Sequence, residues 1–569
     1  MTQASAPARA IPVQMSHRQI LEALSGLLLG MFVAILSGTV VSNALPRIIT
    51  ELDGTQSAYT WVVTSTLLAT TATTPLWGKL ADLTSKKLLV QAALAIFVLG
   101  SVLAGLAQST GQLIACRVVQ GVGAGGLTAL AQVIMATMIA PRERGRYSGY
   151  LGAVMAVGTI GGPLIGGVIV DTAWLGWRWC FYVGVPFAVV ALIVLQKTLD
   201  LPVVKRTVKI DWWGATLITA AVSLLLIWVS LAGNRFDWLS WQTAVMVAGA
   251  LLLGAAAVRI ETRADEPLIP PQLFRNRTIT LSVVASVAVG VGMFGASVFL
   301  SQYFQISRGA SPTRSGLMTL PMILGLLVAA TVVGRIITST GHWKRYLVAG
   351  SALLTVGFAL LGTLRADTPY WQVSVFMALI GIGLGMTMQN LVLAVQNTVG
   401  AHELGTASSV VAFFRSLGGA VGVSALGALL GHNVTRYLTD GLATLGVPAS
   451  AGGGGGTLPD VHTLPAPIRA VVESAYGHGA GDVFLAAAPF GLIALIAVLF
   501  IKEVPLLRHT GGPLTEERKG PLSTPSVVAG HLVDTGTGKP FADRPAAPHD
   551  GGHDLESTRD RSPARALPR

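Results

Sequence analysis

The chain alternates between long apolar runs and short polar segments. Each run is about 20 residues long, which is the length of helix that crosses the hydrocarbon core of a bilayer. Charged residues, glycine or proline bound the runs, so the pattern predicts separate spanning helices. Fourteen such helices are expected, over residues 20–42, 59–79, 88–108, 112–138, 147–170, 180–197, 212–232, 240–258, 278–304, 315–337, 345–364, 371–396, 405–431 and 484–501. The predicted fold class is an all-α membrane protein.

Three stretches lack this pattern. Residues 1–19 are expected to form a cytoplasmic N-terminal tail. Residues 432–483 contain several prolines and a glycine run, which orders only at a high entropic cost, and they are expected to form a long external loop. Residues 503–569 are rich in Pro, Gly, Asp and Arg and poor in large apolar side chains, which predicts a disordered cytoplasmic tail.

Composition supports a membrane location. The chain is 52% hydrophobic and 12% charged, whereas a soluble domain has about 25% charged residues. Its 66 glycines suit membrane helices, which pack closely through small residues. An ordinary soluble enzyme is therefore excluded.

The distribution of Lys and Arg predicts the topology. Basic residues accumulate in the loops on the side of the N-terminus, which the positive-inside rule places in the cytoplasm. An even number of helices puts the C-terminus there too, so we expect a multi-pass protein of the cell inner membrane. Arg308 and Arg314 are exceptions on the external side. The net charge of +12 is spread over loops and tail, so no nucleic-acid partner is expected.

The sequence contains no pattern for catalysis. The two cysteines, Cys116 and Cys180, lie in apolar context, and no His or Cys spacing fits a metal site. No phosphate-binding G-x-x-x-x-G-K-[ST] loop is present, so no nucleotide is expected. We therefore expect no catalytic residues, no cofactor and no metal. The expected partners are a small-molecule substrate, protons and the lipid bilayer.

An internal repeat divides the chain. Residues 78–87 follow the second run, and a similar Gly-Arg and basic segment, 334–345, follows the tenth run. The tenth run is the second of a second set of six if the seventh and eighth runs are an insertion. The expected layout is thus 6+2+6: a six-helix bundle at 20–200, two inserted helices at 201–260 and a second six-helix bundle at 261–502. Two such halves are typical of alternating-access carriers.

The segment after the second run is the first of four motifs. Gly78 would let its helix approach a neighbour closely. Asp82 can accept hydrogen bonds and attract the cations of the next loop on the same side. The charged residues of the two loops are Lys86, Lys87, Arg142, Arg144 and Arg146. Such a cluster can latch one conformation of a rocking bundle, although an ordinary basic cytoplasmic loop is the alternative.

The next two motifs lie inside apolar runs. Arg117 and Gln120 begin a glycine-rich segment of the fourth run, and a buried cation in a membrane helix is usually functional, unless the arginine only snorkels to the surface. The fifth run has glycines at spacings that make a smooth face, together with a proline that favours a kink. The residues of this pattern are Gly149, Gly158, Gly162, Pro163, Gly166 and Gly167.

The fourth motif, residues 36–46 of the first run, completes a resemblance. At these four segments the chain resembles the major facilitator superfamily, and within it the fourteen-helix drug:proton antiporter family of the multidrug efflux type. The resemblance covers about residues 20 to 502. It implies alternating access, a conformational latch in the first motif and, from the glycine pattern of the fifth run, export rather than uptake.

The resemblance also implies proton coupling through Arg117 and Gln120. The family's usual aspartate in the first helix is replaced by Ser37, and serine cannot carry a proton at physiological pH. Glu22 and Asp82 are the remaining candidates, provided that their surroundings shift their pKa values.

The substrate path has several polar candidates. Arg415 lies near the middle of the thirteenth run and could face a central cavity or serve as a contact between helices. Three amides, which also often act only as helix contacts, are Gln302, Gln389 and Asn390.

The expected function is export of hydrophobic or amphipathic drugs or antibiotics by proton-coupled antiport. Two alternatives stay open: a dedicated exporter of an endogenous lipid or secondary metabolite, and a membrane scaffold or sensor that does not transport.

Overall fold

A computed structural model describes residues 17–52, 56–139, 143–172, 174–199, 211–232, 236–264, 267–400, 403–446, 464–504 and 506. Within these residues the chain is helical, apart from turns and one isolated bridge between Ala232 and Phe236. The expected all-α class is confirmed. The N-terminal tail 1–16 and residues 507–569 lie outside the described residues.

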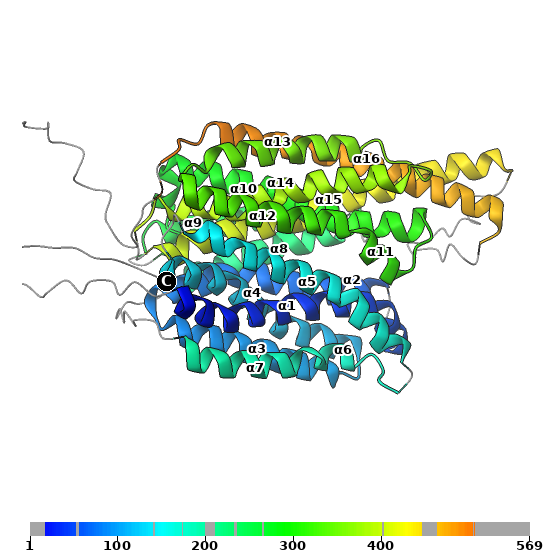
Figure 1. Ribbon diagram of the computed structural model, residues 1–569. Coiled ribbons are helices and arrows are strands. Elements are labelled where there is room, and N and C mark those ends of the chain that lie inside the picture. The colour runs from blue at the N-terminus through cyan, green and yellow to red at the C-terminus, as the bar shows by residue number, and fades with distance from the viewer. Residues whose placement is uncertain are drawn as a thin grey trace, which may run out of the picture. The chain divides into compact units, whose positions relative to one another are not determined.

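The first helices of the chain form one group, drawn in blue to cyan in Figure 1. α4 lies between α2 and α3. Gly123 makes this packing close, because a Cβ atom there would lie 2.5 Å from the backbone nitrogen of Phe97 on α3. The helices of this group are α1 (His17–Glu51), α2 (Gln56–Leu83), α3 (Lys86–Gly105), α4 (Thr110–Met138), α5 (Arg144–Asp171), α6 (Trp179–Tyr182) and α7 (Gly184–Thr198).

The later helices form a second group, drawn in green to orange in Figure 1. Buried side chains such as Phe358, Met377 and Phe484 fill its core. The elements of this group are η1 (Pro271–Arg275), α10 (Arg277–Gln302), η2 (Tyr303–Ser307), α11 (Pro312–Met318), α12 (Leu320–Thr340), α13 (Lys344–Leu361), α14 (Tyr370–Gln396), α15 (Leu404–Thr444) and α16 (Ala466–Leu499).

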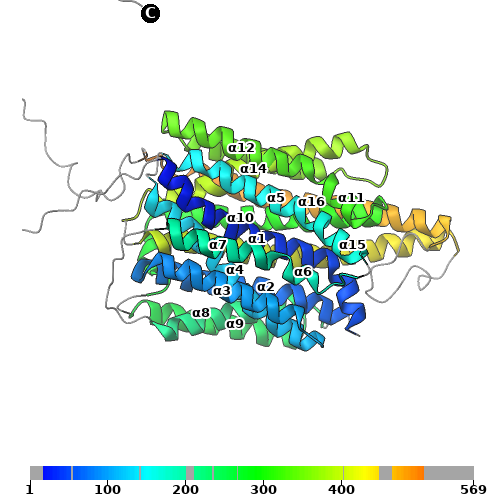
Figure 2. The ribbon, with the colours of Figure 1, turned by 60° about the horizontal axis from the view of Figure 1, so that its bottom comes forward.

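Two further helices, α8 (Trp212–Leu231) and α9 (Trp241–Glu261), form a hairpin between the groups in the sequence. Figure 2 shows them side by side along one flank of the bundle. α8 packs against α2 of the first group and α15 of the second. Trp212 and Trp241 at the hairpin's ends are exposed, as suits aromatic rings at a membrane interface.

Among the described residues, twelve helices are long and apolar enough to cross a membrane. The multi-pass character is therefore confirmed. α2 and α5 are not among the twelve, although each has 28 residues. In α2 many of the residues are threonines, which lower its hydropathy. The count of fourteen spanning helices stays a prediction.

The expected external loop over 432–483 differs from the structure. α15 continues without a break to Thr444, and α16 begins at Ala466. The two helices project together as a hairpin at the right of Figure 1. Residues 447–463, which include the glycine run, lie outside the described residues.

Hydrogen bonds between polar side chains stabilise this hairpin, which explains why the sequence has no continuous apolar run over it. Asp482 of α16 accepts hydrogen bonds from Nδ2 of Asn433 at 3.0 Å and from the hydroxyl of Tyr437 at 2.8 Å, both on α15. Because these side chains satisfy one another across the two helices, the helices extend beyond the apolar segments on which the prediction was based.

Candidate functional site

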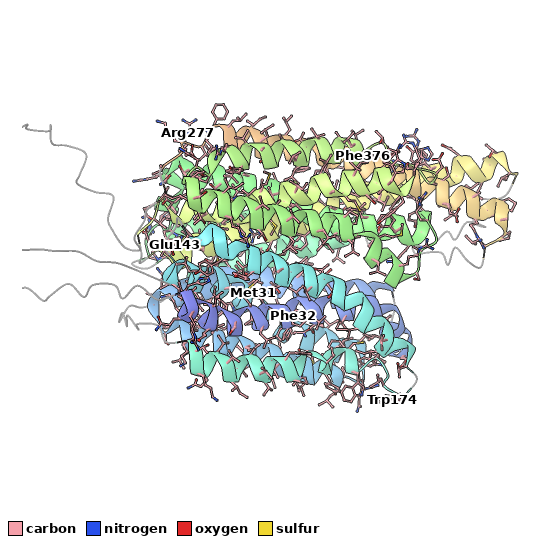
Figure 3. The ribbon with its side chains drawn as sticks, in the orientation of Figure 1. Met31, Phe32, Glu143, Trp174, Arg277 and Phe376 are labelled. Atoms are coloured by element: carbon pink, nitrogen blue, oxygen red, sulfur yellow. The ribbon has the colours of Figure 1, made fainter. Side chains whose placement is uncertain are left out.

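The two groups of helices meet along two helix pairs, α5 with α12 and α2 with α15. We call the end of the bundle at which α1 begins the N-tail end. Figure 3 shows Glu143 and Arg277 at this end and Trp174 at the opposite one. Several of the motif residues gather where the groups touch at the N-tail end.

Asp82, at the end of α2, holds the beginning of α15. Its carboxylate accepts hydrogen bonds from the backbone nitrogens of Gly405 at 2.8 Å and Thr406 at 2.7 Å, and from the Thr406 hydroxyl at 2.8 Å. Unpaired N–H groups and a partial positive charge at a helix N-terminus favour an anion in this position. Asp82 thus caps a helix of the other group.

Gly78 makes the same contact sterically feasible. A Cβ atom at this position would overlap the side chain of Ser409 and would lie 2.8 Å from the carbonyl oxygen of Gly405. The side chain of any other residue would therefore push α2 away from α15, and the expectation that Gly78 permits a close approach agrees with this geometry.

Burial acts on the Asp82 carboxyl as well. It raises the pKa of Asp82 above the ordinary value, while the hydrogen bonds from Thr406 and Gly405 and the charge of Lys86 act in the opposite direction.

A second bond between the groups lies at the N-tail end. Arg144, at the start of α5, is buried and donates a hydrogen bond to Oε1 of Gln396 on α14 at 2.6 Å. It also donates to the carbonyl oxygens of Ala136 and Ile139. Gln396 in turn donates to the hydroxyl of Ser408 on α15 at 2.7 Å. The contact therefore joins three helices from both groups.

The charge cluster expected around Asp82 is organised differently. In the described residues Asp82 bonds to backbone and hydroxyl groups of α15, whereas Arg144 bonds to an amide and to carbonyls. Lys86 acts on Asp82 only electrostatically, and Nζ of Lys87 donates to the carbonyl oxygen of Gln196 in the first group. Arg142 lies outside the described residues. The reason is that the N-terminus of α15 offers Asp82 several backbone donors in fixed positions.

Arg117 belongs to a separate network inside the first group. The side chain is 4% exposed; Nε donates to the carbonyl oxygen of Val62 at 3.3 Å, and Nη1 donates to Oε1 of Gln120. Nε2 of Gln120 donates to the hydroxyls of Ser37 at 3.2 Å and Ser101 at 2.7 Å. Within the described residues this network has no carboxylate.

Ser37 thus takes a structural place in this network. The amide oxygen of Gln120 accepts from the Arg117 guanidinium, and its amide nitrogen donates to the two serine hydroxyls. Glu22, the other coupling candidate, does not join it: its side chain is half exposed at the start of α1 and pairs with Arg18 at 2.8 Å. The sequence does not mark Ser37 and Ser101 as partners of Gln120, because single hydroxyls in apolar runs are common and have no characteristic spacing.

The glycine pattern of α5 faces α1. A Cβ atom at Gly158 would lie 2.9 Å from Cγ2 of Ile35, and one at Gly162 would overlap the side chain of Thr39. The Thr39 hydroxyl donates to the carbonyl oxygen of Gly158 at 3.1 Å. Gly166 is buried as well. The surroundings of Gly149, Pro163 and Gly167 are not described. The structure therefore gives the environment of three of the six motif residues.

The structure does not bring the candidate residues of the substrate path together at one site. Gln389 of α14 lines a small depression between the groups, together with Met155 of α5 and Leu326 of α12. Asn390 instead donates to the carbonyl oxygen of Met386 in its own helix at 2.7 Å. Gln302 is the last residue of α10, near the end opposite to the N-tail end.

Arg415 lies within α15 and is partly accessible. Its backbone packs against Gly290 of α10, where a Cβ atom would overlap the Arg415 carbonyl oxygen. Arg415 has no acidic partner among the described residues. Its guanidinium is therefore a cation that a negatively charged or polar ligand could neutralise.

Comparison with known proteins decides the family. The family model described as Major Facilitator Superfamily matches residues 27–423. The chain belongs to the Major Facilitator Superfamily. Members of this superfamily are transporters, not enzymes, and carry small-molecule substrates across membranes.

Relatives within the superfamily include proteins named for drug efflux. The chain is 38% identical over 484 residues to an uncharacterized MFS-type transporter of Mycobacterium tuberculosis (strain ATCC 25618 / H37Rv), which covers 85% of this chain and 69% of the relative. It is 35% identical over 420 residues to the multidrug transporter protein MdtP of Bacillus subtilis (strain 168), covering 74% and 77% of the two chains.

The fold is shared with a solved structure of the superfamily. The proton:xylose symporter XylE matches with a TM-score of 0.57 at 16% sequence identity, over 85% of this chain and 96% of that one. At this identity the similarity concerns the fold alone.

Proposed function

We propose that the protein exports hydrophobic or amphipathic small molecules, such as drugs or antibiotics, by alternating access and proton antiport. It would belong to the fourteen-helix drug:proton antiporter family, with α2 and α5 completing fourteen spanning helices. We place it in the inner membrane with both termini in the cytoplasm, so that the N-tail end is cytoplasmic.

The contact between Asp82 and the start of α15 carries the proposal. Together with the Arg144–Gln396 bond, it holds the two groups together at the N-tail end. Alternating access requires such reversible contacts, because the groups must separate at one end while they close at the other. We interpret Asp82, Gly78 and Arg144 as a latch that closes the cytoplasmic end.

The direction of transport is inferred from α5. Its glycine face lets α5 lie against α1 while its other side packs along α12 of the opposite group. A helix that contacts both groups in this way can seal the path, and the pattern is that of antiporters in the resemblance stated above. The name of the relative MdtP also favours drug efflux.

In the proposed mechanism, a residue other than Ser37 binds and releases the proton. Arg117 stays protonated, so it can respond to a neighbour's charge but cannot supply a proton. Glu22 is half exposed and distant from the Arg117 network. Because the network has no carboxylate among the described residues, we propose that a carboxyl group elsewhere in the chain exchanges the proton.

A second candidate function is export of an endogenous lipid or secondary metabolite. Arg415 favours this alternative, because a partly accessible cation without a described acidic partner suits a neutral or anionic cargo better than a cationic drug.

The test is efflux of two fluorescent amphipathic dyes, one cationic and one anionic, from energised efflux-deficient cells. We expect export of at least one dye, with loss of export when a protonophore removes the gradient. Gly162→Ala should abolish export because its methyl group meets Thr39. Gly161→Ala is the matched control on the same helix, since its Cβ atom would make only ordinary contacts at 3.4 and 4.0 Å.

The outcomes separate the candidates. Protonophore-sensitive export of the cationic dye supports multidrug antiport. Export of the anionic dye alone supports the metabolite exporter. If export continues unchanged when the protonophore is added, proton coupling is contradicted. If cells that express the protein accumulate more dye than cells without it, the proposed outward direction of transport is wrong.

A further inference from the structure

The inserted hairpin brings two carboxyl groups together at the N-tail end. Asp211 precedes α8 as its N-cap, and Glu261 is the last residue of α9. Oδ2 of Asp211 and Oε1 of Glu261 each lie 2.5 Å from the position that a Cβ atom would take at Gly214, so the two oxygens are at most about 5 Å apart. Gly214 leaves open the space that both of them face.

Each carboxyl group uses one oxygen for a structural bond. Oδ1 of Asp211 accepts from the backbone nitrogen of Gly214 at 2.9 Å, which caps α8. Oε2 of Glu261 accepts from the backbone nitrogen of Ile269 at 3.0 Å. The facing oxygens, Oδ2 and Oε1, are buried and have no hydrogen-bond partner in the part of the chain that the structure describes.

The surroundings make two ionised carboxylates costly here. Glu261 is only 3% exposed. The hairpin also packs in an apolar cluster that includes Ala215, Leu268 and Phe413. The charged groups that act on Glu261 are Asp211 and Lys79 of α2, which is itself 6% exposed. Like charges in a buried space favour sharing of one proton, as in carboxylate pairs generally.

We propose that Asp211 and Glu261 together bind one proton between Oδ2 and Oε1, and so form a proton-binding site where the inserted hairpin meets α2. In the protonated state one of the two facing oxygens carries the proton, in the space that Gly214 leaves open. On release, the O–H bond breaks, the proton passes to water past the partly exposed Asp211, and two carboxylates remain. The added negative charge then acts on the Lys79 ammonium.

The proton-binding site is connected through α2 to the contact between the two groups of helices. Lys79 lies one turn of α2 before Asp82, which bonds to the start of α15. A change in the charge facing Lys79 therefore acts on the same helix end that closes the N-tail end. The proton binding itself does not rest on the proposed export function.

The test is infrared spectroscopy of the full-length protein in lipid as a function of pH. A protonated carboxylic acid has a carbonyl stretching band that an ionised carboxylate lacks. We expect a band present at neutral pH and lost on alkalinisation. Glu261→Gln and Asp211→Asn keep the structural acceptor oxygens, so both should fold. Glu261→Gln should remove this band, and Asp211→Asn, which removes the like charge, should shift the loss of the band to lower pH. Asp237→Asn is the matched control, because Asp237 is exposed at the far end of the same hairpin.

A shared proton makes a quantitative prediction. Glu261→Gln should remove the whole band, and the double variant should remove no more than Glu261→Gln does. Gly214→Ala keeps both carboxyl groups but places a methyl group between them, so it should shift the pH at which the band disappears. If both single variants lost the fold, this shift would still decide the matter.

Three results would overturn the proposal. The band could be absent from the wild-type protein at every pH, or unchanged in both single variants and in Gly214→Ala, or removed by Asp82→Asn alone. Because no substrate is used, each of these results is independent of whether the protein exports a dye.

Discussion

Nη1 of Arg144 on α5 donates a hydrogen bond to Oε1 of Gln396 on α14, 252 residues later in the chain, at 2.6 Å. The bond joins the two groups of helices at the end where α1 begins. Gln396 is a neutral amide, so this contact between the groups is a hydrogen bond and not an ion pair, and it can break at a lower cost when the groups separate.

The first prediction concerns this bond. Gln396→Ala removes the acceptor of Arg144 and the donor to Ser408, so the closed N-tail end should lose about 1–3 kcal/mol. The loss should appear as faster hydrogen exchange at the start of α15. Gln91→Ala is the control, because it breaks a bond of similar kind, to Gln196, within one group. Equal exchange in both variants would contradict the prediction.

The second prediction concerns Asp82. Asp82→Ala leaves the donors of Gly405 and Thr406 unsatisfied, and charge-assisted bonds contribute about 1.5–3 kcal/mol each when counted singly. We expect the population closed at the N-tail end to fall at least tenfold. Distances between spin labels on α3 and α13 would measure it. Asp237→Ala, at an exposed position, should leave the distribution as it is.

The third prediction tests close helix approach. Gly78→Ala places a methyl group against Ser409 and the Gly405 carbonyl, and such overpacking costs about 1–3 kcal/mol. The variant should resemble Asp82→Ala in its distance distribution. Gly38→Ala on α1 has open space at its Cβ position and should behave as wild type. Ser409→Ala should not rescue Gly78→Ala, because the carbonyl of Gly405 stays in place.

The fourth prediction concerns the Arg117 network. Gln120→Leu leaves buried Arg117 with the Val62 carbonyl as its one acceptor in the described part of the chain, so the variant should lose about 2–4 kcal/mol of stability. A lower melting temperature in lipid nanodiscs is the measurement. Ser37→Ala should cost much less, since Gln120 keeps its shorter bond to Ser101. A melting temperature reduced equally in both variants would show that Ser37 has a larger role.

Much of the fold could be predicted from local pattern. Apolar runs of membrane-spanning length indicated the helices, because a helix in lipid must satisfy its own backbone groups whatever its neighbours are. The same rule fails where polar side chains satisfy one another. Asp482 bonds to Tyr437 and Asn433, and the helices α15 and α16 therefore extend through a segment that the sequence pattern assigned to a loop.

The motifs could be found in the sequence, but their partners could not. Asp82 was expected to bind the basic residues of a loop on its own side, and it bonds instead to the N-terminus of α15, more than three hundred residues away. Nothing in the local pattern of residues 404–406 marks them as its partner, because backbone donors belong to every sequence. Asp211 and Glu261 lie 50 residues apart in the sequence, and only the pairing of α8 with α9 makes their oxygens face one space.

By itself, then, the sequence determined an all-helical membrane protein with a repeated set of helices and a family resemblance, since hydrophobicity and spacing act along the chain. The tertiary structure alone decided which groups meet: Asp82 with Thr406, Arg144 with Gln396, and Asp211 with Glu261. The physical reason is that a hydrogen bond or a shared proton depends on distances of a few ångströms between residues far apart in the sequence, and these distances are set by helix packing.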